Sequence, residues 1–300
     1  MQQKILDHEA QVTDAVRAAM GRTANARLRE VMDAFVRHAH AFIREVQPSE
    51  DEFYDGLMWI ASLGHHTNAT NNEVVLAADV LGISTLVDLL NNTASSGETM
   101  SALLGPFYRA NAPICANGEN IARSRTPGPT LLVRGRVLGT DGKPLAGALV
   151  DAWQSSPVGL YDNQDPEQAD MNLRGRFRTD GEGRFWFRSV RPAGYPVPTS
   201  GPVGHLLREQ HRHPYRPAHV HFIVSAPGHR TLITQIFVDD DEYLETDVTF
   251  GVKQSIVGGF QRHKRPDQVR HPDVEAPFYT LDYDFRLPEG VPTYPTAPID

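Results

Sequence analysis

From Thr130 onward the chain alternates short apolar segments with turns rich in Gly, Pro and Asp. Residues 131–154 contain two segments predicted as strands around an Asp-Gly turn, and residues 174–190 repeat this pattern as a second predicted hairpin. Residues 219–238 hold a third pair of predicted strands. Short strands at such regular spacing are typical of an antiparallel β-sandwich, which we predict for this part of the chain.

The first hundred residues follow a helical pattern instead. Apolar side chains from Leu28 to Val46 recur at spacings of three, four and seven residues, and Pro48 ends the run. The next predicted helix is expected to point its apolar residues between Phe53 and Ala61 inward. The sequence therefore predicts a mixed fold, in which residues 1–100 form a helical domain and residues 101–300 form an all-β antiparallel sandwich.

Composition excludes several classes of protein. The formal net charge is −8 and no Lys/Arg-rich block occurs, which argues against a nucleic-acid or anionic-membrane partner. No apolar run reaches the ~20 residues that a membrane span needs. The single cysteine, Cys115, excludes an internal disulfide and a Cys-rich metal site, and no role is assigned to it. With no signal peptide at the N-terminus, we expect a cytoplasmic protein.

His219 and His221 lie two residues apart in a segment that otherwise resembles a buried strand. Side chains at positions i and i+2 of a strand share one face. Two imidazoles on one face therefore indicate a metal site, whereas a single histidine in a strand is more often structural. A cupin-type site would need a carboxylate three or four residues later. Val224 and Ser225 occupy those positions, which excludes that site.

Two tyrosines are candidates for the remaining ligands. Tyr161 follows the segment that carries Trp153, and Tyr195 follows the segment ending at Val190; both lie in turns with Gly and Pro. Each tyrosine alone is also typical of a surface or corner residue. Combined with the two histidines, two phenolates suit a hard trivalent metal, and with one hydroxide they would neutralise Fe³⁺ in a buried site. The residues thus favour a ferric site.

Five segments carry a family resemblance. They are LLGPFYRANAP, GALVDAWQSSPVGLYDNQD, FRTDGEGRFWFRSVRPAGYPVP, RPAHVHFIVSAPGH and TQIFVDDDEYLETD. In this order they resemble the intradiol ring-cleaving dioxygenases, and within them the branch of catechol and hydroxyquinol 1,2-dioxygenases. The resemblance implies a β-sandwich catalytic domain, a homodimer formed through the N-terminal helices and a phospholipid at the dimer interface.

The resemblance also implies a non-haem Fe(III) cofactor and its surroundings. The implied metal ligands are Tyr161, Tyr195, His219 and His221. Tyr195 matches the axial ligand that is released when the substrate binds. Arg216 is implied to stabilise negative charge on the ring that O₂ attacks, although an arginine paired with a carboxylate at a strand edge is the alternative. Gln235 is implied to orient the substrate or a ligand, with a hydrogen-bonded core amide as the alternative.

The substrate preference is expected to depend on the far side of the pocket. In the family pattern, Leu76 and Asp79 lie three residues apart on one helix face. A carboxylate at Asp79 could accept a hydrogen bond from a third ring hydroxyl, and a solvated helix acid is the alternative. The remaining residues implied to line the pocket are Leu103, Gly105, Pro106, Phe107, Val197 and Pro198.

We therefore predict an enzyme of aromatic catabolism that cleaves hydroxyquinol (benzene-1,2,4-triol) with O₂. The expected product is 3-hydroxy-cis,cis-muconate, which is converted to maleylacetate. A catechol or chlorocatechol 1,2-dioxygenase is the nearest alternative. A non-enzymatic β-sandwich binding module and a ferrous oxygenase with two histidines and one carboxylate are the alternatives from other classes.

Overall fold

The computed structural model describes residues 5–94, 97–265 and 274–299. The chain divides into two compact units, Met1–Ala61 and Ser62–Asp300. The predicted division at residue 100 follows the change from helix to strand, and as a domain boundary it stays a prediction. The helices around residues 73–91 belong to the same compact unit as the sheets.

The first unit is helical, as predicted. It contains α1 (Glu9–Met20), α2 (Ala26–Val46) and the start of α3 (Glu50–His65). Asn25 caps α2 by accepting a hydrogen bond from the backbone N–H of Leu28 at 2.9 Å. The expectation that the apolar side chains of α3 point inward is wrong for this chain, because Phe53, Leu57, Ile60 and Ala61 are all exposed. Within the described part of the first unit, no element covers that face of α3.

Three further helices accompany the sheets of the second unit: α4 (Glu73–Val80), α5 (Ile83–Asn91) and α6 (Pro202–Glu209). Gly82, with φ of +70°, makes the sharp turn between α4 and α5. The buried carboxylate of Glu73 accepts a hydrogen bond from the backbone N–H of Val203 at 3.0 Å, which joins the start of α4 to the start of α6.

The first sheet has the strand order β10-β11-β1-β12, and β4 pairs with β1. Its strands are β1 (Thr130–Gly139), β4 (Arg184–Val190), β10 (Phe260–His263), β11 (Phe278–Asp282) and β12 (Phe285–Leu287). β4 runs antiparallel to β1, whereas β11 and β12 run parallel to it.

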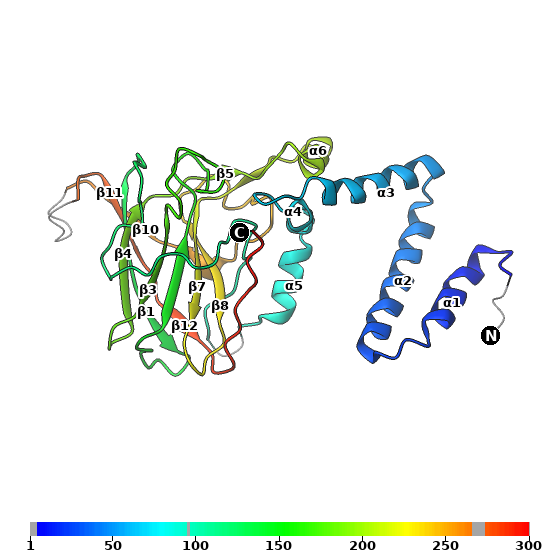
Figure 1. The fold of residues 1–300 in the computed structure, drawn as a ribbon, viewed down its shortest axis with the longest axis horizontal. Helices are drawn as coiled ribbons and strands as arrows, with labels where there is room; N and C mark the ends of the chain where they lie inside the picture. Colours follow the sequence, from blue (N-terminus) through cyan, green and yellow to red (C-terminus); the bar gives the residue numbers. More distant parts are fainter. Residues whose placement is uncertain (1–4, 95–96, 266–273, 300) are drawn as a thin grey trace. The chain divides into compact units, whose positions relative to one another are not determined.

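The second sheet has the strand order β3-β2-β7-β8-β9. Its strands are β2 (Leu149–Trp153), β3 (Arg174–Arg178), β7 (His219–Ser225), β8 (Leu232–Val238) and β9 (Val257–Gly258). Only β9 is parallel to its neighbour. A separate pair of short strands, β5 (Tyr195–Pro196) and β6 (Tyr215–Arg216), completes the described sheets. Antiparallel pairing dominates, so the predicted fold class is confirmed (Figure 1).

Two of the three predicted hairpins cross between the sheets. β1 and β2 belong to different sheets, and so do β3 and β4, whereas β7 and β8 form an antiparallel hairpin as predicted. The Asp-Gly turns are present, with positive φ at Gly142 and Gly183. In a two-layer fold, a strand can pair with the preceding strand in the same sheet, or it can lie in the facing sheet. Both arrangements bury its apolar face, and turn residues alone do not decide between them.

The sandwich core lies between the two sheets and follows the alternation of side chains along each strand. Its buried members include Leu131, Val133, Val150, Ala152, Phe177, Phe185, Phe187, Val220, Phe222, Val224 and Ile236. Because Val220 and Phe222 face this core, His219 and His221 face the opposite side of the second sheet. The sequence thus directs both imidazoles away from the sandwich interior and toward the loops that cover the outer face.

Among the described residues, no helix is both long enough and apolar enough to cross a membrane.

Candidate metal centre

Four side chains meet on the outer face of the second sheet. The Nε2 atoms of His219 and His221 are 3.0 Å apart, and the Nε2 atom of His221 is 3.2 Å from the phenol oxygen of Tyr161. The phenol oxygens of Tyr161 and Tyr195 are also 3.2 Å apart. All four residues are at most 4% exposed. The structure therefore brings together the four side chains that the sequence indicated as metal ligands.

The strand register fixes the two histidines. Trp153 on β2 pairs with His221 on β7, and its indole stacks on the imidazole with ring centroids 4.6 Å apart and 8° between the planes. His221 pairs on its other side with Gln235 of β8. The central position of β7 between two paired strands leaves the imidazoles little freedom to move.

The two tyrosines come from loops that pack against each other. Gly159, with φ of +82°, lies so close to Tyr195 that an added Cβ would be 2.7 Å from the Tyr195 Cβ. Tyr195 itself is held by the pairing of β5 with β6, where it lies opposite Arg216. The glycine that precedes Tyr161 by two positions is thus required for the close approach of the two phenols.

The protonation states favour a bound cation. Burial lowers the pKa of His219 to about 3, and the positive charge of Arg216 adds to this effect. Burial, together with His219, lowers the pKa of His221 well below its ordinary value. The Nδ1 of His219 lies 2.7 Å from the carbonyl oxygen of Pro217, so the proton belongs on Nδ1 and the lone pair of Nε2 points at the other donors. Both imidazoles are therefore neutral, which is the form that can bind a metal ion.

The phenols have the opposite tendency. Burial raises the pKa of Tyr161 well above 10, and it also raises the pKa of Tyr195. A cation between the two oxygens would offset this penalty by favouring the phenolates. Within the described residues, no group of three or more His, Cys, Asp and Glu side chains could hold a metal ion. Two phenol oxygens and two neutral imidazoles nevertheless fit a hard metal ion such as Fe³⁺.

Arg216 lies beside this cluster and is 3% exposed. Its Nε and Nη2 donate to the two carboxylate oxygens of Asp247, each at 3.1 Å, and Nη2 also donates to Oε1 of Gln235 at 2.9 Å. Its Nη1 is 3.4 Å from Nε2 of His219. The arginine has a carboxylate partner, but the pair is buried at the site and does not lie at an exposed strand edge. Its guanidinium points at the donor cluster.

The Leu103–Phe107 loop covers the cluster. Nε2 of Gln235 donates to the carbonyl oxygen of Leu103 at 2.6 Å. A Cβ at Gly105 would lie 3.2 Å from Cε1 of His221, and the ring of Phe107 is 4.7 Å from the ring of Tyr161. These contacts bring the loop predicted to line a substrate pocket, including the buried Pro106, against the four donors.

Asp79 is 4% exposed on α4, so it is not a solvated helix acid. Burial raises its pKa to about 6, while a hydrogen bond from Ser84 and the charge of Arg216 partly counter this rise. Leu76 is buried three residues earlier on α4. For Val197, buried beyond β5, and for its half-buried neighbour Pro198, a place in the pocket stays a prediction.

Three features of the site were not predicted from the sequence. They are the stacking of Trp153 on His221, the anchoring of Arg216 by Asp247, and a buried Asp162–Arg174 ion pair behind Tyr161. Trp153 had a sequence signal, because it ends the apolar strand segment that directly precedes the Tyr161 loop. The two ion pairs join residues that are 31 and 12 positions apart, and no motif in the sequence indicates either pairing.

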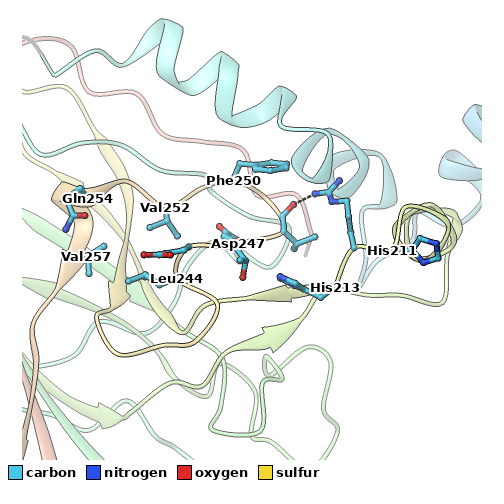
Figure 2. A pocket seen from close by; sticks show the side chains of 12 residues that line it. His211, His213, Leu244, Asp247, Phe250, Val252, Gln254 and Val257 are labelled. Carbon is cyan, nitrogen blue, oxygen red and sulfur yellow. Dashed lines mark hydrogen bonds between the residues drawn. The ribbon is translucent and has the colours of Figure 1, made fainter. Parts of the chain in front are cut away.

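A cavity of about 670 Å³ adjoins the anchor of Arg216. Asp247, Leu244 and Phe250 line it from the loop before β9, and His211 and His213 line it from the segment after α6 (Figure 2). Asp247 also accepts hydrogen bonds from the backbone N–H groups of two residues in its own loop, Thr249 at 3.2 Å and Gly251 at 3.0 Å. Hydrogen bonds within this loop therefore hold Asp247 in place between the cavity and Arg216.

Comparisons with known proteins show to which family the chain is similar. Residues 103–289 match the family described as "Dioxygenase", and residues 25–99 match "Catechol dioxygenase N terminus". The chain is 42% identical to hydroxyquinol 1,2-dioxygenase of Rhizobium sp. (strain MTP-10005), over 93% of this chain and 95% of that protein. It is 40% identical to 6-chlorohydroxyquinol 1,2-dioxygenase of Cupriavidus pinatubonensis, over 92% of this chain and 96% of that protein.

A solved structure shows the same likeness. Hydroxyquinol 1,2-dioxygenase from Pseudomonas putida DLL-E4 superposes with a TM-score of 0.87 at 37% identity, covering 94% of this chain and 99% of that chain. Both family matches, the identity over nearly the full length and the shared fold lead to one conclusion. The chain is an enzyme of the intradiol ring-cleaving dioxygenase family, in its catechol and hydroxyquinol 1,2-dioxygenase branch.

Proposed function

We propose that this enzyme cleaves hydroxyquinol between its two adjacent hydroxyl-bearing carbons, using O₂, and forms 3-hydroxy-cis,cis-muconate, which leads to maleylacetate. The observation that carries this proposal is the buried convergence of two imidazole nitrogens and two phenol oxygens beside Arg216. The names of the similar proteins support the substrate. The reaction belongs to aromatic catabolism, and we propose a cytoplasmic location for it.

Membership of this family implies non-haem iron, and the donor set fits it. We propose that Tyr161, Tyr195, His219 and His221 hold the iron as Fe(III). When bound there, ferric iron would act as a Lewis acid toward the two adjacent substrate hydroxyls and activate the ring for reaction with O₂.

The surrounding residues have separate roles in this proposal. Arg216 stabilises the negative charge that develops on the substrate ring, because a guanidinium keeps its proton and acts by electrostatics. The phenolate oxygen of Tyr195 accepts a proton from a substrate hydroxyl. Gln235 is bonded to both Arg216 and the Leu103 carbonyl, so it aligns the guanidinium with the loop that covers the substrate.

Asp79 is the proposed specificity residue. Its buried carboxylate would accept a hydrogen bond from the third hydroxyl of hydroxyquinol, and it would be left unpaired beside catechol. Catechol or chlorocatechol as the preferred substrate is the alternative, with the same iron site. We propose that the remaining contacts to the substrate ring are made by Leu76, Val197 and Pro198.

The exposed apolar side chains of the N-terminal helices support a proposed homodimer. Phe35 is 63% exposed and Phe42 is 59% exposed on α2, and Ile60 on α3 is 61% exposed. Burial of these groups against a second copy would remove apolar surface from water. We further propose, from the family resemblance alone, a phospholipid at that interface.

A substrate panel tests the proposed function. The iron-loaded protein is incubated with hydroxyquinol, catechol and chlorocatechols under ¹⁸O₂, and the products are identified by mass. We expect the highest kcat/KM for hydroxyquinol and two ¹⁸O atoms in its ring-opened product. A product with one ¹⁸O atom, or cleavage outside the diol, would contradict the proposal.

A further inference from the structure

Arg174 is a buried arginine that is not one of the four donors of the candidate metal centre. It begins β3 and is 1% exposed. Because Phe177 of the same strand faces the sandwich core, Arg174 extends from the outer face, on the side of the donor cluster. Burying a guanidinium costs free energy of desolvation, which its hydrogen-bond and ion-pair partners must offset. The partners of Arg174 therefore indicate its role.

Those partners belong to two separate segments of the site. Nε of Arg174 donates to Oδ1 of Asp162 at 2.7 Å, and Nη2 is 2.6 Å from the same oxygen. Nη1 donates to the carbonyl oxygen of Phe107 at 2.8 Å. Asp162 directly follows Tyr161, and Phe107 ends the loop that covers the cluster. One side chain therefore ties the backbone beside Tyr161 to the covering loop.

The two segments also meet through their rings. The centroids of Phe107 and Tyr161 are 4.7 Å apart, with 30° between the planes. The second carboxylate oxygen of Asp162 accepts from Nη1 of Arg109 at 2.6 Å and from the backbone N–H of Met171 at 3.0 Å. Asp162 thus binds the end of the covering loop in two ways: directly through Arg109, two residues after Phe107, and through Arg174, which alone of the two donates to the Phe107 carbonyl oxygen.

The charge of Arg174 is close to the phenol. Its guanidinium carbon is 5.8 Å from the centroid of the Tyr161 ring. The side chains of Arg174 and Asp162 are each 1% exposed, so water screens this charge weakly. A fixed positive charge at this distance favours an electron-rich Tyr161 ring.

We propose that Arg174 is a positioning residue of the reaction: it holds Tyr161 and the Leu103–Phe107 loop in register and keeps a positive charge against the Tyr161 ring. This inference rests on the proposed function, since it assigns Tyr161 to the iron. A charge-transfer transition moves an electron from a phenolate to iron. A cation that stabilises the phenolate electrons raises the transition energy, so loss of Arg174 shifts the absorption band to longer wavelength.

The test compares R174Q and R174K with R176Q in the iron-loaded, full-length protein. Glutamine removes the charge, whereas lysine keeps a charge but lacks the planar fork that reaches Asp162 and Phe107 together. Arg176 is the matched control, because it lies two residues further on the same strand and its Nε donates to the carbonyl oxygen of Ala112 at 2.5 Å. Circular dichroism first establishes that each variant is folded.

Three readouts are measured: the wavelength of the visible band, the rate of iron release to a chelator, and kcat/KM for hydroxyquinol. In R174Q we expect a band at longer wavelength, faster iron release and a fall in kcat/KM of about 10- to 100-fold. In R174K we expect the fall in kcat/KM with a band near the wild-type wavelength. R176Q should match the wild type in all three.

A folded R174Q or R174K protein with the wild-type spectrum and wild-type kcat/KM would overturn the inference. Equal effects in R176Q would overturn it as well, since they would show a general sensitivity of β3. If R174Q releases its iron before a spectrum can be taken, the spectrum of R174K is used instead. A band at longer wavelength in R174K would contradict the proposal that the positive charge at this position sets the wavelength. A colourless, inactive wild-type protein would instead contradict the proposed function itself.

Discussion

The indole of Trp153 lies parallel to the imidazole of His221, with 4.6 Å between the ring centroids and an angle of 8° between the planes. The two residues are also register partners on neighbouring strands. Trp153 is 1% exposed and joins a cluster with both site tyrosines. The donor cluster is thus continuous with an aromatic core on the outer face of the sheet.

Replacing Trp153 by leucine should weaken the iron site and the fold together. The lost ring leaves a cavity against His221, and we expect a decrease in the free energy of unfolding of about 3 kcal/mol. Iron release to a chelator should be faster. The matched control is W186L, because Trp186 is 41% exposed and should cost less than about 1 kcal/mol. Equal losses in both variants would contradict the supporting role of Trp153.

Asp247 should control the placement of Arg216. D247N keeps the side-chain shape but removes the charge that faces the guanidinium, which is bonded at 3.1 Å to each carboxylate oxygen. We expect kcat/KM to fall by about 10- to 100-fold, mainly through kcat, with the iron band little changed. The control is D239N, since Asp239 accepts from the backbone N–H of Phe260 and lies outside this network. Unchanged kinetics in D247N would contradict the anchoring.

Asp79 gives a prediction on stability. Burial raises its pKa to about 6, above the ordinary value of 3.8, so the folded protein favours the protonated carboxyl. The charged form destabilises the fold progressively as pH rises from about 4 to about 6 and stays destabilising above that range. D79N should therefore be more stable than the wild type at pH 7, by roughly 1–3 kcal/mol, and about equal to it at pH 3.5. Denaturant unfolding at both pH values measures this difference.

The same residue should set the substrate preference. An ionised Asp79 accepts a stronger hydrogen bond from the third hydroxyl than a protonated one does, so the ratio of kcat/KM for hydroxyquinol to that for catechol should rise between pH 5.5 and pH 7.5. In D79N the ratio should be lower and independent of pH over this range. A wild-type ratio retained by D79N would show that another residue selects the substrate.

The sequence predicted those parts of the molecule that depend on local patterns. The i and i+2 spacing of His219 and His221 was sufficient to place both imidazoles on one face of a strand. The Gly-rich turns around Tyr161 and Tyr195 indicated residues held by rigid loops. Strand positions were predicted well because alternation and turn residues are local signals.

Pairing between distant strands was harder to predict. The Asp-Gly turns around Gly142 and Gly183 suggested hairpins, yet each connects strands in different sheets. The carboxylate partners of Arg216 and Arg174 are 31 and 12 residues away, and only the folded arrangement selects them from the many acids of the chain. Whether the apolar side chains of α3 are buried depends on which other surface packs against them, and the sequence of one chain does not specify that surface.

Tyr195 and Tyr161 provide the test of the ligand set. In Y195F and Y161F, loss of a phenolate should remove or shift the visible charge-transfer band and lower kcat/KM by about 100-fold or more. Y215F is the control, because Tyr215 stacks on Tyr243 and contributes no oxygen to the cluster. A Tyr215 variant as strongly affected as the other two would point to a general disturbance of the loops.

Resonance Raman spectroscopy of the iron-loaded wild-type protein, with excitation in the visible band, asks whether tyrosinate oxygens bind the iron. We expect tyrosinate ring vibrations enhanced by the iron, which change in Y161F and in Y195F and remain in Y215F. A protein that binds iron without any tyrosinate enhancement, or whose spectrum is the same in all three variants, would contradict this expectation.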